Sequence, residues 1–318
     1  MSRLILKSTN RLVLKKREFL ISPEKYKELI HLPLEEKIRK AEVAIQEFHN
    51  FANGKIYVAF SGGKDSTVLL DIVRSLYEEV PGVFINTGLE YPEIIKFVNS
   101  KENITHIKPK LKFQDVIEQY GYPVISKEVS RAVFEILTSK SEKLIHKRLH
   151  GVGIYKNGKL SEKWKYLLNA PFKINDICCY KLKKDPAKRF EKETKLFPII
   201  GTMTSDSSFR EQNYLKHGGC NILNNKRPLS KPLSIWTEND IWNYIKKYNL
   251  PYSTIYDKGY YRTGCMFCAF GVHLESPNKF ELMEYTHPQH YKFCMEKLGL
   301  RKVLEWINEN GKNIHIPF

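Results

Sequence analysis

The segment Ile56-Tyr-Val-Ala-Phe-Ser-Gly-Gly-Lys-Asp-Ser66 decides the fold of this chain. Its first five residues are apolar or aromatic and predict a short buried strand, which ends at the turn formers Gly62 and Gly63. From Thr67 to Glu79, apolar residues recur at the 3.6-residue period of a helix packed on a sheet. The segment therefore predicts a strand, a glycine turn and a helix N-terminus in succession.

This turn has the chemistry of an anion-binding site. Glycines allow the backbone to approach a phosphate closely, and the first N–H groups of a helix have no partners within the helix. Four polar residues surround the two glycines, which favours a phosphate site over an ordinary strand–helix turn: Ser61, Lys64, Asp65 and Ser66. The segment is neither a Walker A loop nor a G-x-G-x-x-G dinucleotide motif.

Strands and helices alternate along the chain after this segment begins. Strands are predicted near 56–60, 82–86 and 104–108, and helices near 66–79, 92–101 and 113–120. The alternation is typical of an α/β fold with a mostly parallel, twisted sheet and helices on both faces. Three regions are expected: an extension over 1–52 with a hairpin in 1–16 followed by helices, a nucleotide-binding domain over 53–264, and a helical region with the C-x-x-C over 265–318.

Four of the six cysteines form two close pairs, Cys178-Cys179 and Cys265-Met-Phe-Cys268. A C-x-x-C and a remote pair can complete four-sulfur coordination of zinc or of an iron–sulfur cluster, and the spacing leaves both open. A disulfide framework is not expected, because 318 residues can bury a core without staples and the first residues lack the apolar stretch of a signal peptide. With no run of eighteen apolar residues, the sequence predicts a cytoplasmic protein that does not span a membrane.

The chain carries a formal charge of +17 at pH 7. Residues 139–195 hold 16 Lys and Arg against 6 Asp and Glu, a net charge of +10 in one stretch. A basic excess of this size attracts polyanions. We therefore expect residues 139–195 to be a basic insertion that contacts nucleic acid, with a solvated lysine surface as the alternative.

Several segments carry a resemblance to a known family. Ser61 to Ser66 resembles the S-G-G-x-D-S pyrophosphate loop (PP-loop) of the N-type ATP pyrophosphatases. Asn86 to Glu93 is similar to the D-T-G-x-x-F-P-E segment of phosphoadenylyl-sulfate and adenylyl-sulfate reductases, with Asn86 in place of the aspartate and Tyr91 in place of the phenylalanine. Three later segments resemble the same family: Gly201 to Arg210, in which Met203 replaces an arginine, Lys231 to Tyr244, and Tyr256 to Cys268.

The resemblance implies an adenine nucleotide alpha hydrolase-like fold that binds ATP and Mg²⁺. It implies nucleotide binding by the loop and by the later motifs, at Ser61, Gly62, Gly63, Lys64, Asp65, Ser66, Thr87, Gly88, Glu90, Gly201 and Ser207. Asp65 is expected to help hold Mg²⁺, and Lys64 and Arg210 to offset charge that develops on the phosphates.

The resemblance also bears on the cysteines. In adenylyl-sulfate reductases, an adjacent cysteine pair and a later C-x-x-C hold a [4Fe–4S] cluster, so the resemblance implies that Cys178, Cys179, Cys265 and Cys268 do so here, with zinc as the second choice. Cys220 is expected either to substitute for a ligand or to act as a catalytic thiol, because a thiolate near so much positive charge would be nucleophilic.

One departure separates the fold match from the reaction match. The reductases use a cysteine in a C-terminal E-C-G-[IL]-H segment, and the sequence contains no cysteine after Cys294. The preferred prediction is therefore an ATP pyrophosphatase-type enzyme of nucleic-acid-directed adenylyl or sulfur transfer, similar to the ATP pyrophosphatases of DNA phosphorothioation and to tRNA thiolases.

Two alternatives to this prediction stay open, a sulfonucleotide reductase and a non-catalytic nucleotide- or DNA-binding module with a structural metal centre. The expected partners are DNA or tRNA and a sulfur donor such as a cysteine desulfurase. An oligomer is compatible with the sequence.

Overall fold

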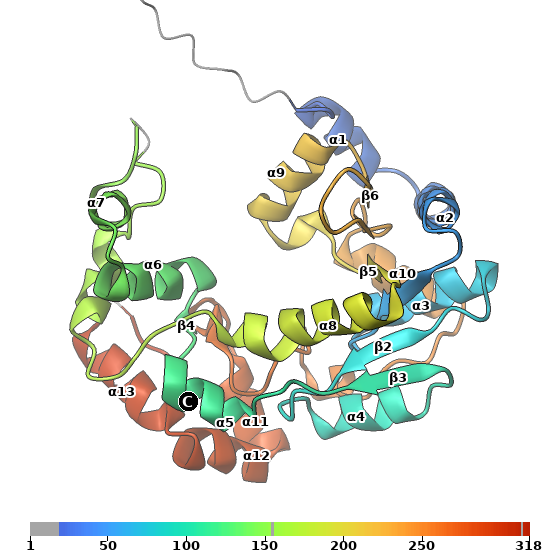
Figure 1. Cartoon of the computed structure of the whole chain (residues 1–318). Helices are drawn as coiled ribbons and strands as arrows, with labels where there is room; N and C mark the ends of the chain where they lie inside the picture. Colours follow the sequence, from blue (N-terminus) through green and yellow to red (C-terminus); the bar gives the residue numbers. More distant parts are fainter. Residues whose placement is uncertain (1–18, 154–155, 313) are drawn as a thin grey trace, which may run out of the picture.

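A six-stranded sheet forms the centre of the protein, in a computed structural model that describes residues 19–153, 156–312 and 314–318. The strands lie in the order β3-β2-β1-β5-β7-β6 (Figure 1). All neighbouring strands pair in parallel except β6 and β7, which are antiparallel. The strands are β1 (Ile56–Ala59), β2 (Gly82–Ile85), β3 (Ile104–Ile107), β5 (Phe197–Ile200), β6 (Asn221–Ile222) and β7 (Leu229–Ser230).

Strand β1 lies between two other strands of the sheet, and both of its faces are buried. In the ladder, Val58 pairs with Gly82 of β2 on one side and with Ile199 of β5 on the other. Val58 is fully buried, as expected for a strand covered by helices on both faces of a parallel sheet.

Helices cover both faces of the sheet. Helix α2 (Leu34–Phe51) and helix α10 (Glu238–Lys247) pack against α3 (Lys64–Leu76), the helix that follows β1. Tyr57, whose side chain points away from that of Val58, contacts α8 (Asp185–Thr194) through the ring of Phe190, with the ring centroids 5.3 Å apart. The predicted α/β class with a mostly parallel sheet and helices on both faces is confirmed.

The remaining helices are α1 (Pro23–Ile30), α4 (Pro92–Asn99), α5 (Phe113–Tyr120), α6 (Lys127–Thr138), α7 (Glu142–His150), α9 (Ser208–His217), α11 (Lys279–Thr286), α12 (Pro288–Lys292) and α13 (Leu300–Asn310). The predicted helices that begin after Ser22 and at Leu34 are present, whereas the predicted hairpin in 1–16 lies outside the described residues. None of the described helices is long and apolar enough to cross a membrane.

A second, two-stranded sheet lies apart from the main one. Strand β4 (Val124–Ile125) pairs in parallel with β8 (Ala269–Phe270), which follows the C-x-x-C segment directly. The sequence reading did not identify this sheet, because each strand is only two residues long. This sheet joins the segment before the basic stretch to the C-terminal region, and it places the C-x-x-C segment next to residues 124–125.

Candidate active site

The predicted phosphate loop connects β1 to α3 and is held by its own hydroxyl groups. Ser61 Oγ lies 3.1 Å from Ser66 Oγ, and the Gly63 N–H donates to Ser61 Oγ at 3.4 Å. Gly62 has a φ of 75°, and a Cβ at this position would lie 2.7 Å from Val98 Cγ2 of α4. Because only glycine tolerates both the backbone conformation and the close approach, this residue sets the shape of the loop.

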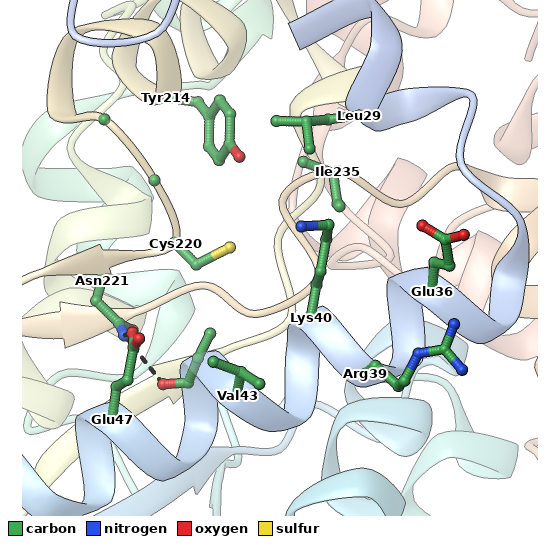
Figure 2. A pocket seen from close by; sticks show the side chains of 13 residues that line it. Leu29, Glu36, Arg39, Lys40, Val43, Glu47, Tyr214, Cys220, Asn221 and Ile235 are labelled. Atoms are coloured by element: carbon green, nitrogen blue, oxygen red, sulfur yellow. Dashed lines mark hydrogen bonds between the residues drawn. The ribbon is translucent and has the colours of Figure 1, made fainter. Parts of the chain in front are cut away.

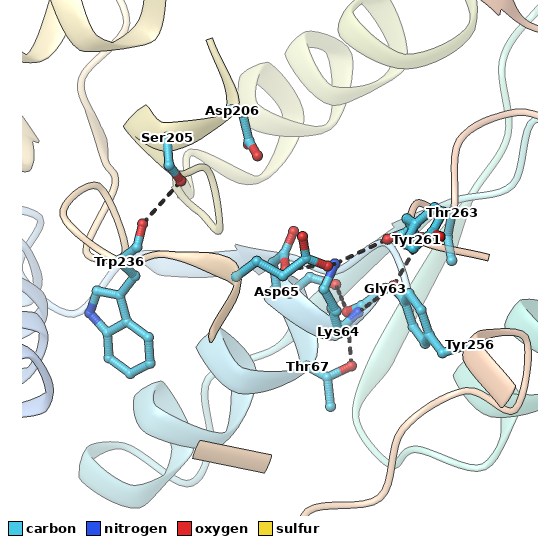
Figure 3. A network of polar contacts seen from close by, with 12 residues as sticks. Gly63, Lys64, Asp65, Thr67, Ser205, Asp206, Trp236, Tyr256, Tyr261 and Thr263 are labelled. Atoms are coloured by element: carbon cyan, nitrogen blue, oxygen red, sulfur yellow. Dashed lines mark hydrogen bonds and ion pairs between the residues drawn. The ribbon is translucent and has the colours of Figure 1, made fainter. Parts of the chain in front are cut away.

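Lys64 is a buried cation at the start of α3, with 5% of its surface exposed. Its Nζ donates to the carbonyl of Tyr261 at 3.2 Å and lies 3.3 Å from a carboxylate oxygen of Glu238 (Figure 3). Burial opposes the charge, but Asp65, Tyr256 and Glu238 together raise the pKa of Lys64 above its usual range. Lys64 is therefore a permanent positive charge beside the loop.

Asp65 has a carboxylate oxygen that forms an ion pair but no hydrogen bond. Its buried Oδ1 has no hydrogen-bond partner, and it lies 3.7 Å from Lys64 Nζ. Burial raises the pKa of Asp65, and the nearby carboxylates of Asp206 and Glu238 raise it further, against the opposing effect of Lys64. A bound divalent cation would supply the missing partner for Oδ1 and favour the ionised carboxylate. Asp65 thus fits the predicted Mg²⁺ ligand.

The loop opens into a cavity of about 1100 Å³. This volume is large enough for a nucleotide together with part of a second substrate. Seven cationic side chains line the cavity, and they come from segments far apart in the sequence: Lys64, Lys127, Lys183, Lys184, Arg210, Arg227 and Arg262. Four acidic residues accompany them, Asp65, Glu128, Asp206 and Glu238, so the lining favours a polyanionic ligand.

Most of the predicted nucleotide-binding residues lie on this cavity: Ser61, Gly63, Lys64, Asp65, Ser66, Gly201, Ser207 and Arg210. A Cβ on Gly201 would come within 3.1 Å of the Asp65 carbonyl, so this glycine lets β5 approach the loop. Ser207 caps α9, where its Oγ accepts from the Arg210 N–H at 3.3 Å. Arg210 forms an ion pair with Asp206 and donates to the Met203 carbonyl at 3.4 Å.

The loop after β2 takes a different place from the one expected. Thr87, Gly88 and Glu90 do not line the cavity. The Glu90 carboxylate accepts from the Thr87 N–H at 2.9 Å and from Thr87 Oγ1 at 2.7 Å, so it holds the loop in shape. The Leu89 carbonyl in turn accepts from the Met266 N–H at 2.9 Å. These residues therefore support the C-x-x-C turn, and their predicted contact with a nucleotide has no support in the cavity lining.

The two cysteine pairs, far apart in the sequence, lie near each other in the structure. Cys178 and Cys179 lie directly before a π-helical segment (Tyr180–Lys184), and the Cys268 N–H closes the C-x-x-C turn by donating to the Cys265 carbonyl at 3.0 Å. The hydrogen bond between Cys178 and Cys179, burial, and the charges of Cys179, Cys268 and Cys265 raise the pKa of Cys178. The charge on one cysteine pair therefore acts on the other.

Positive charge surrounds the four sulfurs. The charge of Cys265 raises the pKa of Lys183. The pKa of Cys179 is lowered by the hydrogen bond between Cys179 and Cys178, and the charges of Lys127 and Lys183 lower it further. Within the described ranges, no three His, Cys, Asp or Glu side chains are placed to hold a single metal ion. A [4Fe–4S] cluster binds each cysteine to a different iron, so its ligands lie farther apart than those of one zinc. Four thiols are a donor set that suits either a [4Fe–4S] cluster or a zinc ion.

Cys220 lies elsewhere, in a second cavity of about 640 Å³ between α2 and the turn after α9 (Figure 2). Lys40 and Glu47 face it from α2. Burial raises the pKa of Cys220 to about 11. Burial therefore disfavours the expected nucleophilic thiolate, because desolvation outweighs the nearby positive charge. Nor does Cys220 share surroundings with the four paired cysteines, so the structure does not support its role as a substitute ligand.

Cys220 should therefore react slowly with iodoacetamide at pH 7, and its alkylation rate should rise about tenfold per pH unit up to pH about 11. Only the thiolate reacts, and this pKa keeps its fraction very small at neutral pH. The measurement is mass spectrometry of the Cys220 peptide over a pH series, with a small-molecule thiol as the reference. A rate that levels off below pH 8 would contradict the assignment.

Two functional positions had no signal in the sequence. Lys127 follows a two-residue strand, and Glu238 lies in the first turn of α10, yet both line the cavity. Only the tertiary fold brings them there. Arg262, before the C-x-x-C, also lines the cavity, whereas the neighbouring Tyr260 is buried and its hydroxyl lies 2.9 Å from Thr286 Oγ1. Tyr260 is a packing residue.

The chain is similar to a known protein family and to several known proteins. A model of the phosphoadenosine phosphosulfate reductase domain matches residues 55–124 and 106–270. An uncharacterized protein of Methanocaldococcus jannaschii is 25% identical over 76% of this chain, which spans 48% of that protein's length. Adenosine 5′-phosphosulfate reductase 2 of Bacillus subtilis is 27% identical over 67% of this chain and 72% of its own. The phosphoadenylyl-sulfate reductase structure from Candida auris aligns with a TM-score of 0.41 at 18% identity, over 77% of this chain and 96% of its own.

Proposed function

The chain belongs to the phosphoadenosine phosphosulfate reductase domain family, and from this premise we propose that it splits ATP into an adenylated acceptor and pyrophosphate. Two neighbouring groups after strand β1 carry the proposal. Asp65 Oδ1 is buried without a hydrogen-bond partner, and Lys64 is a buried cation beside it. Magnesium and a fixed lysine are the groups that stabilise pyrophosphate as a leaving group.

The reaction needs little from the protein besides positioning. An acceptor oxygen attacks the α-phosphorus of ATP, the bond from that phosphorus to the bridging oxygen breaks, and pyrophosphate departs with Mg²⁺. Lys64 and the positive end of the α3 dipole offset the charge of the β and γ phosphates, and Arg210 at the cavity wall offsets charge on the acceptor side. A hydrosulfide ion, which a reducing thiol releases from the persulfide of the sulfur donor, then attacks the adenylated atom of the acceptor. The bond from that atom to the AMP oxygen breaks, so AMP departs and sulfur stays on the acceptor.

The proposed acceptor is a nucleic acid, DNA or tRNA. The cationic lining of a cavity larger than one nucleotide needs, together with the net charge of +17, supports a polyanionic second substrate. Cys178, Cys179, Cys265 and Cys268 would hold a [4Fe–4S] cluster, which when bound supplies a thiophilic site for the incoming sulfur. The flanking lysines, Lys127 and Lys183, would offset its negative charge. A cysteine desulfurase is the proposed source of sulfur, and the cytoplasm the proposed compartment.

An anaerobic assay of pyrophosphate release from ATP and Mg²⁺ tests the proposal. We expect release to rise at least tenfold when single-stranded DNA or tRNA is added, because the acceptor supplies the attacking oxygen. The amount of adenylated nucleic acid, or of AMP when a sulfur donor is present, should match the amount of pyrophosphate. Absence of release from an iron-loaded preparation, with every acceptor tried, would overturn the proposal.

A sulfonucleotide reductase is the second candidate. The relatives support it, since a 27% identical protein over 72% of its own length is an adenosine 5′-phosphosulfate reductase. Replacement of an arginine by the buried Met203 at the cavity wall removes a positive charge that a sulfate group would meet, which argues for the first candidate. Sulfite release from adenylyl sulfate, dependent on a dithiol reductant, would instead establish the reductase.

A further inference from the structure

Helix α7 presents a stripe of cations to solvent. The helix has no fully buried residue. Its half-buried side chains, Leu144, Ile145, Arg148 and Leu149, repeat on one side of the helix, and Arg148 pairs with Glu135 of α6 at 2.5 Å. The exposed residues are Glu142, Lys143, His146, Lys147 and His150, and the spacing of three and four places the last four on one face. Lys140, also exposed, extends this row just before the helix.

The charges of this row are not neutralised by the protein. Among the described residues, Lys140, Lys143 and Lys147 form no ion pair, whereas the nearby Lys159 and Lys165 both pair with Glu162. The single acid in the helix is Glu142, in its first turn. A run of unpaired lysines on a helix that buries little of itself creates a local positive field, which favours binding of a polyanion.

The row is connected to the cavity through α6. This helix begins at Lys127, which lines the cavity, and α7 packs on it (Figure 1). Its 12 residues span about 18 Å at 1.5 Å per residue. A stacked strand, single or in a duplex, places a phosphate every ~3.4 Å, so the lysine row lies about five stacked nucleotides from a nucleotide held in the cavity.

We propose that Lys140, Lys143 and Lys147 bind the phosphate backbone of the nucleic-acid acceptor about five nucleotides from the reacting residue. The inference rests on the proposed function and adds a remote anchoring surface to it. A backbone contact at this distance positions the strand without reading its sequence. An anionic membrane is the competing occupant, because Phe134 and Leu137 of α6 are exposed near α7. Nucleic acid is favoured because the cationic lining of the cavity continues towards the row at Lys127.

The test compares two variants that remove the same charge. One is Lys140→Ala, Lys143→Ala, Lys147→Ala. The control is Lys292→Ala, Lys297→Ala, Lys302→Ala, which removes three exposed lysines from the C-terminal helices. Binding of fluorescein-labelled single-stranded DNA and RNA of 4 and 16 nucleotides is measured by anisotropy over a salt series, and binding of phosphatidylserine vesicles by co-sedimentation.

We expect the α7 variant to bind the 16-mers about tenfold more weakly, with the salt slope reduced by about 2, since each lost contact removes about 0.7. The 4-mers cannot reach from the cavity to the row, so their binding should stay unchanged, as should all binding by the control variant. Unchanged affinity for the 16-mers would overturn the inference. So would vesicle binding that the α7 variant loses while it keeps oligonucleotide binding.

The inference and the proposed function can fail separately. If the α7 variant loses 16-mer binding but the wild-type protein never releases pyrophosphate, the surface is right and the reaction is wrong. If pyrophosphate release requires nucleic acid but the α7 variant binds and reacts like the wild type, the reaction is right and the surface is wrong.

Discussion

Replacing Asp65 with asparagine should lower pyrophosphate release from ATP by at least about 100-fold, the usual loss when one electrostatic partner of a transition state is removed. The amide is nearly the same size as the carboxylate, but it carries no charge for Mg²⁺ and would leave Lys64, 3.7 Å away, without its nearest acid in α3. The measurement is pyrophosphate release at saturating ATP over a Mg²⁺ titration, in the presence of the acceptor nucleic acid.

The matched control is Glu78→Gln, which makes the same change of charge at an exposed position just after α3. It should leave release unchanged. Thermal unfolding of both variants separates a loss of function from a loss of fold. A variant at Asp65 that keeps wild-type release and wild-type Mg²⁺ dependence would contradict the role of Asp65 Oδ1 as a metal ligand.

Replacing Cys265 or Cys179 with serine should remove most of the iron from the protein. Anaerobically prepared wild-type protein is expected to contain about four iron and four sulfide per chain and to absorb visible light, as four cysteines bind a [4Fe–4S] cluster. A serine at one ligand position leaves an iron without its thiolate, and Lys183 without the sulfur charge that raises its pKa. Iron and sulfide analysis with the absorption spectrum provides the readout, independent of any activity.

Cys220→Ser is the control for this experiment. The thiol lies in a separate cavity, and burial keeps it protonated, so its loss should not change the iron content. Loss of iron from the Cys220 variant would contradict the proposed ligand set. A preparation that contains zinc, with no iron or sulfide, would replace the cluster by a single-ion site.

Local sequence patterns were sufficient for the core of the fold. The predicted strands near 56–60, 82–86 and 104–108 correspond to β1, β2 and β3, and the predicted helix near 113–120 has the bounds of α5. These elements follow from hydrophobic periodicity, because each buries one face or both faces against its neighbours. The strands β4, β6, β7 and β8 were not predicted, since two residues are too short for a period-2 pattern, and β4 also pairs with a partner far away in the chain, β8.

The same division applies to the site. The loop from Ser61 to Ser66 was predicted from its own residues, because its glycine geometry and its place at a helix N-terminus are local properties. Thr87 and Glu90 were expected to contact the nucleotide, but in the structure they form hydrogen bonds with each other. The expected reactivity of Cys220 did not take account of burial, which the sequence does not display and which raises the pKa of the thiol against the effect of Lys40.

The sequence by itself determined the phosphate loop, the two cysteine pairs and the basic character of residues 139–195, since each depends on residues close together in the chain. Only the tertiary structure decided that the two cysteine pairs, 86 residues apart from Cys179 to Cys265, act on each other and on Lys183. It also decided that Lys127, Arg210 and Arg262 surround one cavity. Long-range contacts fix burial and the distances between charges, and these set the pKa values and the binding chemistry of the site.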